Sequence, residues 1–430
     1  MLAASAAFFA VPIWFYRVSQ PHNESLSTAS GAASSGKMTS QELRASSSLA
    51  LIFALRMLGL FLVLPVFALE AAKYPGGNDT AMVGLAMGLY GLTQAVFQLP
   101  LGMASDRWGR KRIIVAGLAV FAVGSLLAAL ADSLTGLMAG RALQGAGAVS
   151  AAVTALMSDL TRDSVRTKAM AMVGASIGLM FALALVLSPL LAAWVGLSGI
   201  FGLTFALALA GMAVVLWVVP PEPEQQSNAP RGKPHELLQH KDLLRLNVGV
   251  FILHTVQMAM WVAVPALLVA AGLSKEGHWK VYLPAVVLSF VAMGALFSME
   301  RRGKLRAALL SAIALVLMVQ LGLGAVVQTT VQPSLMLMGL LMFLFFVGFN
   351  VLEASQPSLV SRMAPVHLRG AALGAYNTLQ SLGLFAGGFI GGALAKWGGM
   401  PALFGATTVL MVLWLLITWP LQPVGRPARA

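Results

Sequence analysis

The chain has 430 residues, of which 58% are apolar and only 10% are charged, and it contains no cysteine. Soluble proteins carry about a quarter charged residues, so this composition excludes a soluble enzyme. The lack of cysteine excludes disulfides, thiolate catalysis and cysteine-held metal centres. The net charge of +13 would suit a nucleic-acid-binding protein only if the basic residues gathered on one surface, so their positions decide its meaning.

The hydropathy pattern predicts an all-α membrane protein with twelve transmembrane helices in two pseudo-symmetric six-helix halves. A bilayer core of about 30 Å is crossed by roughly 20 apolar residues, and segments of that length recur along the chain. The predicted spans are 47–69, 81–104, 112–131, 134–157, 168–194, 199–219, 246–271, 280–299, 305–328, 334–357, 371–395 and 402–420.

The basic residues follow these spans. If the first span starts in the cytoplasm, only four of the 28 basic residues fall on the outer side, two lie inside spans, and the other 22 lie on the inner side. This asymmetry is the positive-inside rule, which predicts that both termini are cytoplasmic. The high charge is therefore a signal of topology, and nucleic-acid binding is not expected. The four outer residues are Lys73, Lys275, Lys280 and Lys396.

A polar, proline-rich linker at 221–245 separates the halves 46–220 and 246–421. A short basic link, DRWGRKR, follows the second span, and a similar one, ERRGKLR, follows the eighth, which indicates an internal duplication. Residues 1–45 are expected to be a disordered N-terminal extension or the product of a wrongly assigned start, with Met38 as the native first residue. Residues 422–430 are expected to be a short cytoplasmic tail.

Two motifs resemble those of the major facilitator superfamily. GMASDRWGRKR (102–112) is similar to the GxxxDRxGRR/K signature between the second and third spans, and GRALQGAGA (140–148) is similar to the RxxQGxG element of the fourth span. LRMLGLFLVLPV, YGLTQAVFQLPLG, EGHWKVYLP and FNVLEASQPSLVSR further resemble YajR-type inner-membrane transporters, within the twelve-span drug:proton antiporter branch. The resemblance implies a bacterial-type inner (plasma) membrane location.

The sequence departs from this resemblance at two places. YajR-type chains continue into a small cytosolic domain, whereas this chain stops at Ala430. In the fifth span, Ser188 precedes Pro189 where the antiporter branch has a glycine. Serine is small and proline still bends a helix, so a hinge at these residues remains expected. Gly145 and Gly147 of the fourth span are predicted to contribute to the same flexibility.

The loop after the second span is a candidate conformational gate. The basic residues there could simply fix topology, but that role needs no acid, and the loop contains Asp106. The resemblance implies that Asp106 lies where the two halves meet and that Asp159 pairs with Arg110. Such a cluster would bias the equilibrium between two open states. The predicted gate residues are Gly102, Asp106, Arg107, Gly109, Arg110 and Asp159.

Four ionisable residues interrupt the spans, namely Arg56, Arg141, His254 and Glu353. Each costs at least about 2.5–3.5 kcal/mol on insertion scales, which makes it a functional candidate. Glu353 is the carboxylate well inside a span, so we expect it to carry the coupled proton, shared with His254. The arginines would supply counter-charge. The alternative interpretations are an acid paired between helices, a histidine bonded to a carbonyl, and an arginine whose head group reaches the interface.

Polar residues on the same cavity-lining spans are candidates for substrate binding, although such side chains also bond helices together. They are Tyr90, Gln94, Gln98, Gln144, Gln257, Asn350, Tyr376, Asn377 and Gln380.

The expected function is secondary active transport, in which proton entry drives efflux of small amphipathic or cationic molecules. The P-loop pattern GxxxxGK[ST] is missing, so ATP drive within the chain is not expected. The alternatives are a proton-coupled importer of a sugar or other metabolite, and a membrane sensor or lipid-handling protein without ion-coupled turnover. We expect no enzymatic activity, no metal, no cofactor other than the coupling proton, a lipid environment and a monomer.

Overall fold

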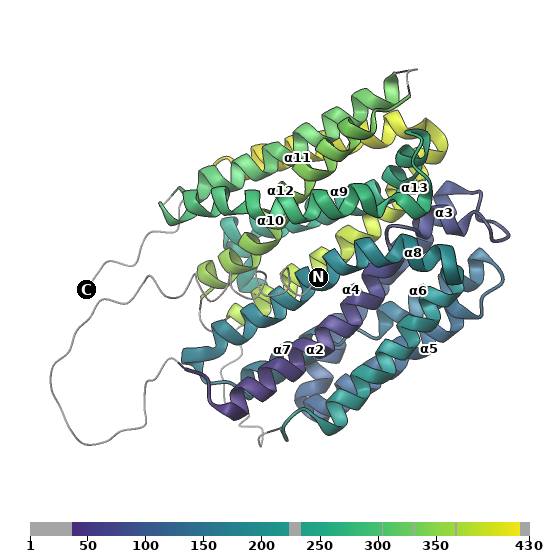
Figure 1. Cartoon of the computed structure of the whole chain (residues 1–430). Coiled ribbons are helices and arrows are strands. Elements are labelled where there is room, and N and C mark those ends of the chain that lie inside the picture. Colours follow the sequence, from purple (N-terminus) through teal and green to yellow (C-terminus); the bar gives the residue numbers. More distant parts are fainter. Residues whose placement is uncertain (1–36, 223–233, 303, 330–331, 366–367, 422–430) are drawn as a thin grey trace, which may run out of the picture.

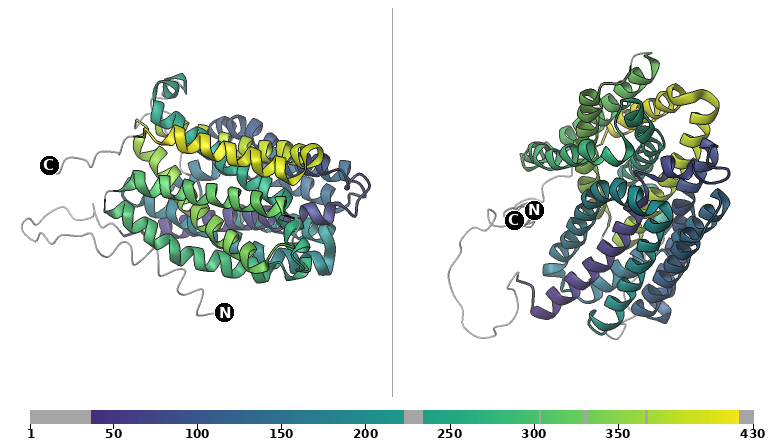
Figure 2. Two further views of the ribbon diagram at one scale, coloured as in Figure 1. Left: turned by 90° about the horizontal axis from the view of Figure 1, so that it is seen from above. Right: turned by 45° about the vertical axis from the view of Figure 1, so that its right-hand side comes forward.

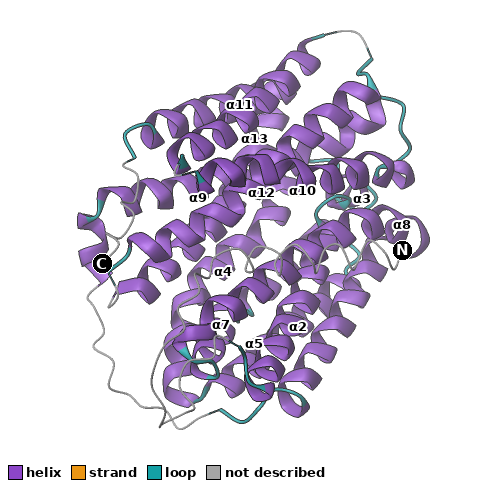
Figure 3. Ribbon diagram, turned by 60° about the vertical axis from the view of Figure 1, so that its left-hand side comes forward, coloured by secondary structure: helices purple, strands orange, loops and turns teal. Residues whose placement is uncertain are grey.

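The computed structural model describes residues 37–222, 234–302, 304–329, 332–365 and 368–421. The predicted tail, residues 223–233 of the predicted linker and the first 36 residues of the predicted extension lie outside these ranges. Nearly all described residues are helical, and none of them forms a strand (Figure 3). The all-α prediction is therefore confirmed.

The first half is a bundle of helices, three of which begin at a capping side chain. Thr39 and Glu42 form a reciprocal capping box, and the Asp79 carboxylate accepts hydrogen bonds from the backbone N–H groups of Ala81 and Met82. The helices are α2 (Ser40–Val63), α3 (Phe67–Ala71), α4 (Thr80–Trp108), α5 (Arg110–Ala129), α6 (Leu134–Ala146), α7 (Ser150–Asp159) and α8 (Asp163–Trp217).

The second half is a similar bundle, and its helices run alongside those of the first (Figures 1 and 2). Helices α4 and α13 pack across the boundary between the halves, as do α8 and α10. The helices of this half are α9 (Lys241–Ala270), α10 (Trp279–Arg301), α11 (Leu305–Gln328), α12 (Leu335–Met363) and α13 (Arg369–Thr418), with the short 3₁₀ helices η1 (Pro234–Gln239) and η2 (Lys275–Gly277).

Helices α8 and α13 each contain two predicted spans joined at a glycine. The backbone leaves the helical conformation at Gly196 (φ 65°) and at Gly399 (φ 70°), where a residue with a side chain would be strained. An exposed tryptophan lies two residues before each glycine, and a buried phenylalanine lies five residues after it. This repetition supports the predicted duplication of the halves. The matching pairs are Trp194 with Trp397 and Phe201 with Phe404.

The predicted fourth span is divided into α6 and α7. The break falls at Gly147, where close packing leaves no room for a side chain, because an added Cβ would lie 2.4 Å from the Gly117 carbonyl oxygen. Nine helices of the described chain are long and apolar enough to span a membrane, and two of them, 54 and 50 residues long, contain the bends described above. With α6 and α7 together forming one further crossing, the arrangement is consistent with twelve spans.

The bundle has two ends, which the following sections call the α3 end and the linker end. The α3 end contains α3, η2 and the bends at Gly196 and Gly399. The linker end contains Gly109 and Glu222. The topology prediction assigns the α3 end to the outside and the linker end to the cytoplasm.

Glycines let the two halves approach closely along α4 and α13. A Cβ added to Gly388 would lie 2.5 Å from the Gly84 carbonyl oxygen, and one added to Gly84 would lie 2.7 Å from the Gly392 Cα. Backbone-to-backbone contact of this kind is how small residues stabilise helix pairs in membranes, where water does not drive association.

We expect Gly388→Ala to lower the midpoint of thermal unfolding by several degrees. The added methyl group forces α4 and α13 apart, and overpacking of this kind costs about 1–3 kcal/mol. Gly405→Ala on the same helix is the matched control, because a Cβ there meets nothing within 4 Å. Equal midpoints for the two purified variants would contradict the role of this contact.

Candidate functional site

Glu353, His254 and Gln380 come together at the middle of the second half and are called the carboxylate cluster. The Gln380 amide nitrogen lies 3.1 Å from Glu353 Oε1 and 2.8 Å from His254 Nε2, and His254 Nε2 lies 3.4 Å from Glu353 Oε2. The Glu353 side chain is 37% exposed, although its neighbours Val351 and Leu352 are buried. The Glu353 side chain is therefore partly accessible within α12, although its Oε2 atom is buried without a hydrogen-bond partner.

The hydrogen bonds of His254 fit a neutral imidazole. Its Nδ1 lies 3.0 Å from the Val250 carbonyl oxygen, which accepts a proton but cannot donate one. With the proton on Nδ1, Nε2 is free to accept from the Gln380 amide. Protonation would turn Nε2 into a donor that faces Glu353, and the Gln380 amide would then have to rotate. The cluster thus has two self-consistent hydrogen-bond patterns that differ by one proton.

Arg56 and Arg141 lie around the Tyr90 ring in the first half and form, with it, the arginine cluster. Arg56 donates to the Tyr90 hydroxyl at 2.7 Å and to the Ser150 hydroxyl at 3.1 Å. Arg141 donates to the Gln144 side-chain oxygen at 3.0 Å, and its guanidinium lies 4.9 Å from the centre of the Tyr90 ring. Cation–π contact and neutral oxygens therefore hold both charges.

A polar bridge joins the two clusters across the halves. Arg56 donates to the Gln94 side-chain oxygen at 3.3 Å, and the Gln94 amide donates to the Ser381 hydroxyl at 2.9 Å. Ser381 directly follows Gln380 of the carboxylate cluster in α13. Ser381 was not predicted as a site residue, because a single serine in an apolar span gives no signal in the sequence.

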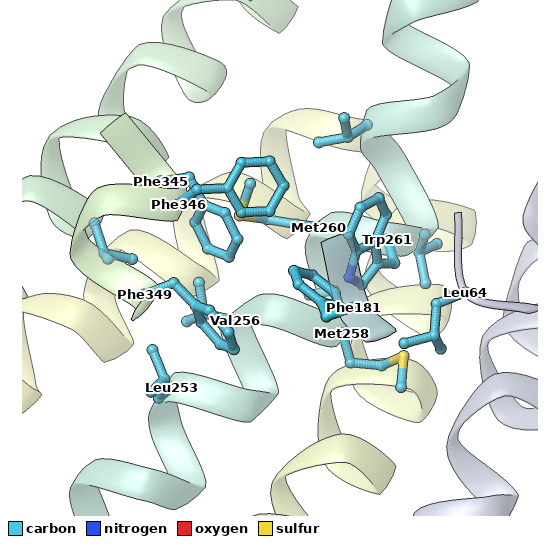
Figure 4. Close-up of a cluster of buried hydrophobic side chains, with 14 of the residues drawn as sticks. Leu64, Phe181, Leu253, Val256, Met258, Met260, Trp261, Phe345, Phe346 and Phe349 are labelled. Carbon is cyan, nitrogen blue, oxygen red and sulfur yellow. The ribbon is translucent and has the colours of Figure 1, made fainter. Parts of the chain in front are cut away.

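Aromatic side chains close the other side of the boundary between the halves, and the sequence analysis missed them. Phe61 of α2 packs edge-on against Phe181 of α8, with ring centres 5.1 Å apart. Phe181 lies 6.0 Å from Phe346 and 6.3 Å from Phe349, both on α12 of the second half (Figure 4). Phe349 in turn contacts the His254 ring at 6.0 Å. Aromatic residues in apolar helices are ordinary packing, so their pattern could not mark them out.

The remaining predicted substrate residues are spread more widely. Asn350 donates to Ser289, and Gln144 donates to Ser125, so both bond neighbouring helices. The Tyr376 hydroxyl is buried without a hydrogen-bond partner. Gln98 and Gln257 are buried, and the Asn377 carbonyl accepts from Ser381.

The predicted gate residues meet at the linker end. Arg110 pairs with Asp106 one helical turn away, with Asp159 at the end of α7 at 3.1 Å, and with the Ser105 hydroxyl at 2.8 Å. Gly109 (φ 96°) provides the sharp turn that places Arg110 at the start of α5. Gly102 packs near Ala151, and Arg107 lies in the last turn of α4.

Glu222 also belongs to this end, although the sequence did not predict it. Its carboxylate accepts from the backbone N–H groups of Arg110 at 2.7 Å and Lys111 at 3.3 Å. A carboxylate at a helix N-terminus is favoured by the helix dipole. It therefore ties the start of the linker to α5, a contact between distant segments that local patterns cannot reveal.

The predicted hinge residues are closely packed. Ser188, which replaces the expected glycine before Pro189, is fully buried and donates to the Leu62 carbonyl oxygen at 2.5 Å. A Cβ on Gly145 would lie 2.1 Å from the Tyr90 carbonyl oxygen. The serine thus fastens α8 to the end of α2, and Gly145 lets α6 approach α4.

Two ion pairs join the halves at the α3 end. The buried Glu70 of α3 pairs with Lys275 of η2 at 3.0 Å and with Lys73 at 2.5 Å. Asp79, at the start of α4, pairs with Lys396 of α13 at 2.7 Å. The Lys396 ammonium, by bonding the carboxylate, lowers the pKa of Asp79, so this pair persists at neutral pH and is lost only as the pH falls through the lowered pKa.

Known proteins similar to this chain are transporters. Residues 49–388 match the Major Facilitator Superfamily. The chain is 41% identical over 386 residues to the inner membrane transport protein YajR of Escherichia coli, covering 89% of this chain and 84% of that protein. It is 28% identical over 387 residues to the multidrug resistance protein MdtH of Aeromonas salmonicida, covering 85% and 94%.

A solved structure of a bacterial homolog of the human lysosomal transporter Spinster, in an inward-facing and occupied conformation, shares the fold. Its TM-score is 0.66 at 15% identity, and the match covers 89% of this chain and 97% of that one. The match confirms the predicted fold, and the relatives confirm that the protein is a transporter and not an enzyme. The chain belongs to the Major Facilitator Superfamily.

Proposed function

We propose that the protein is a proton-coupled secondary transporter that exports small amphipathic molecules by alternating access. The observation that carries the proposal is the carboxylate cluster, in which Glu353 is partly exposed in the middle of a span and touches His254 and Gln380. The similarity to a protein named multidrug resistance protein MdtH supports export. Both termini are proposed to be cytoplasmic, and the transporter is proposed to act as a monomer in the inner membrane.

In this mechanism, Glu353 carries the proton, and the orientation of the Gln380 amide depends on whether that proton is bound. When Glu353 is ionised, it accepts from the Gln380 amide, which also fills the acceptor position of His254. A proton on His254 Nε2 turns that acceptor into a donor, and a proton on Glu353 Oε2 can be donated to Nε2 in competition with the amide. Either change displaces the Gln380 amide from Nε2 and makes it rotate. Because Ser381, next to Gln380, contacts Gln94 of the first half, the rotation alters a contact between the halves. Protonation thereby biases the equilibrium between the two open states.

Replacing Glu353 with Gln should abolish transport driven by a pH gradient while leaving exchange of substrate across the membrane. Glutamine keeps the size of the side chain but cannot carry a proton. The measurement is flux in proteoliposomes, with and without an imposed gradient, of the first ligand found by a thermal-shift screen. Glu276→Gln, which removes a carboxylate from the loop at the α3 end, is the control. Full gradient-driven transport by Glu353→Gln would exclude Glu353 as the carrier.

The ion pairs at the α3 end are proposed to hold that end closed. We expect Glu70→Gln to favour the state that is open at the α3 end and closed at the linker end, because Lys275 loses its partner in the other half. The chain has no cysteine, so spin labels on Leu43→Cys and Arg302→Cys report the separation of the halves at the linker end without background.

In Glu70→Gln, the fraction of molecules with the shorter distance between the two labels should increase. The double variant Glu70→Lys, Lys275→Glu, in which the two charges are exchanged, should restore the original distance distribution. Asp132→Asn, an exposed charge in the turn between α5 and α6, should change nothing. An unchanged distribution in Glu70→Gln would rule out the latch.

The cluster around Arg110 is proposed to act as the gate at the linker end. Asp106→Asn or Arg110→Gln removes one side of the ion pairs and should alter the same distance distribution. Because Asp106 and Arg110 lie at the linker end and Glu70 at the α3 end, the effect of either variant should persist when Glu70 is also replaced. A distribution identical to that of the parent protein would leave the cluster with a purely structural role.

Two alternatives have distinct signatures. A proton-coupled importer would accumulate substrate when protons enter with it, whereas the exporter releases substrate as protons enter, so the sign of flux under a pH gradient separates them. A membrane sensor or lipid-handling protein would bind a ligand without counterflow of a labelled copy.

A further inference from the structure

The arginine cluster has two buried positive charges, and no carboxylate of the described residues pairs with either. Arg56 and Arg141 are 2% and 1% exposed. In the described part of the chain, no carboxylate lies within 4.0 Å of either guanidinium, and the partners of both are the neutral oxygens of hydroxyl, amide and carbonyl groups. The Nε atom of each arginine is buried without a hydrogen-bond partner. These neutral groups stabilise the two guanidinium charges only in part.

The charges of both arginines fall on the same ring. The Tyr90 ring centre is 6.0 Å from the Arg56 guanidinium carbon and 4.9 Å from that of Arg141. Arg56 also lies 5.7 Å from the centre of the Phe121 ring. Ring quadrupoles compensate a cation only in part, and the low dielectric of the interior makes the mutual repulsion of the two guanidinium groups larger than it would be in water. Glu353, the carboxylate in the middle of α12, lies in the other half and is occupied by His254 and Gln380. The first-half side of the boundary is therefore electropositive.

The groups around Arg56 suit a ligand. Its partners Gln94 and Ser150 are only partly buried, and both carry polar hydrogens that an anion could accept. Phe61 of α2 packs against the buried cluster that contains Tyr90 and Phe121, the two rings that the Arg56 guanidinium faces. Phe61 also begins the aromatic series that continues to Phe181 and Phe349. A cationic head group and an aromatic surface therefore adjoin at the boundary between the halves.

We propose that this boundary binds an amphipathic anion, with a carboxylate or sulfonate at Arg56 and an apolar aromatic body against Phe61, Phe181 and Phe349. The inference rests on the proposed transport function, whose substrate it specifies, and it replaces the expectation of a cationic substrate with an anionic one. Ser150 and Gln94 donate hydrogen bonds to the anion. Arg141, which lies against the Tyr90 ring, adds electrostatic attraction over a longer distance. The anion supplies the counter-charge that the chain itself does not.

Two fluorescent dyes that differ only in charge test the proposal. 8-Anilinonaphthalene-1-sulfonate is an aromatic anion, and N-phenyl-1-naphthylamine is the same molecule without the sulfonate. Their affinities are measured by fluorescence titration of the full chain in nanodiscs of neutral phosphatidylcholine, with empty nanodiscs subtracted. We expect the anion to bind about tenfold more tightly than the neutral dye, as a charge-assisted hydrogen bond in a buried site allows. Tetraphenylphosphonium, a cation, should not displace it.

Two variants locate the effect at Arg56. Arg56→Gln should weaken anion binding about tenfold and change the affinity for the neutral dye less than twofold, whereas Arg56→Lys should retain most of the preference. Gln94→Glu should also remove the preference, because it supplies an internal carboxylate next to Arg56 and nearly preserves shape, which keeps the test valid if Arg56→Gln fails to fold. Arg44→Gln, which removes an exposed charge at the linker end, is the control for net charge.

Equal affinities for the two dyes, or a preference that survives both Arg56→Gln and Gln94→Glu, would overturn the anion site. The proposed transport function fails separately. Selective binding of the sulfonate without any gradient-driven flux would remove the transport mechanism and leave the anion site standing. Gradient-driven flux of cations by a protein without sulfonate preference would do the reverse.

Discussion

A charge inside a membrane must be compensated where it lies, and this constraint organises the protein. Moving an ion into a low-dielectric medium costs several kcal/mol even after the surroundings relax. The chain confines most of its charges to the links, and the four that remain inside spans are held in two clusters, one in each half. Each cluster is compensated in a different way, and that difference is the basis for the separate function proposed for each.

The carboxylate cluster is compensated by groups that can change protonation. Glu353 and His254 both accept from the Gln380 amide, and in the proposed mechanism a proton makes one of them a donor, which Gln380 accommodates by rotating its amide. The arginine cluster cannot respond in this way, because guanidinium groups stay charged at all physiological pH values. The charge of the arginine cluster is therefore constant, and we propose that it favours an anion. The charge of the carboxylate cluster, in contrast, changes when a proton binds. A proton and a substrate would act on opposite halves of the same boundary.

Communication between these clusters depends on how closely the halves approach. The glycines of α4 and α13 bring two backbones into contact, which allows the short side chains Gln94 and Ser381 to meet. A larger residue at Gly84 or Gly388 would push the two backbones apart. Ion pairs at the α3 end then hold the halves together on that side, where Glu70 and Asp79 of the first half meet Lys275 and Lys396 of the second.

The sequence by itself determined the fold class, the position of most spans and the identity of the unusual charges. These follow from local rules, since a span needs a fixed length of apolar residues and a charge within it is conspicuous. The sequence also predicted that Arg110 meets Asp159, through the resemblance of its motif to a known family. Only the tertiary structure decided which in-span residues touch. It paired Glu353 with His254 and Gln380, left Arg56 and Arg141 without a carboxylate, and added Ser381, Glu222 and the phenylalanines of the boundary. Those contacts join residues far apart in the chain, and periodicity carries no information about which faces of two distant helices meet.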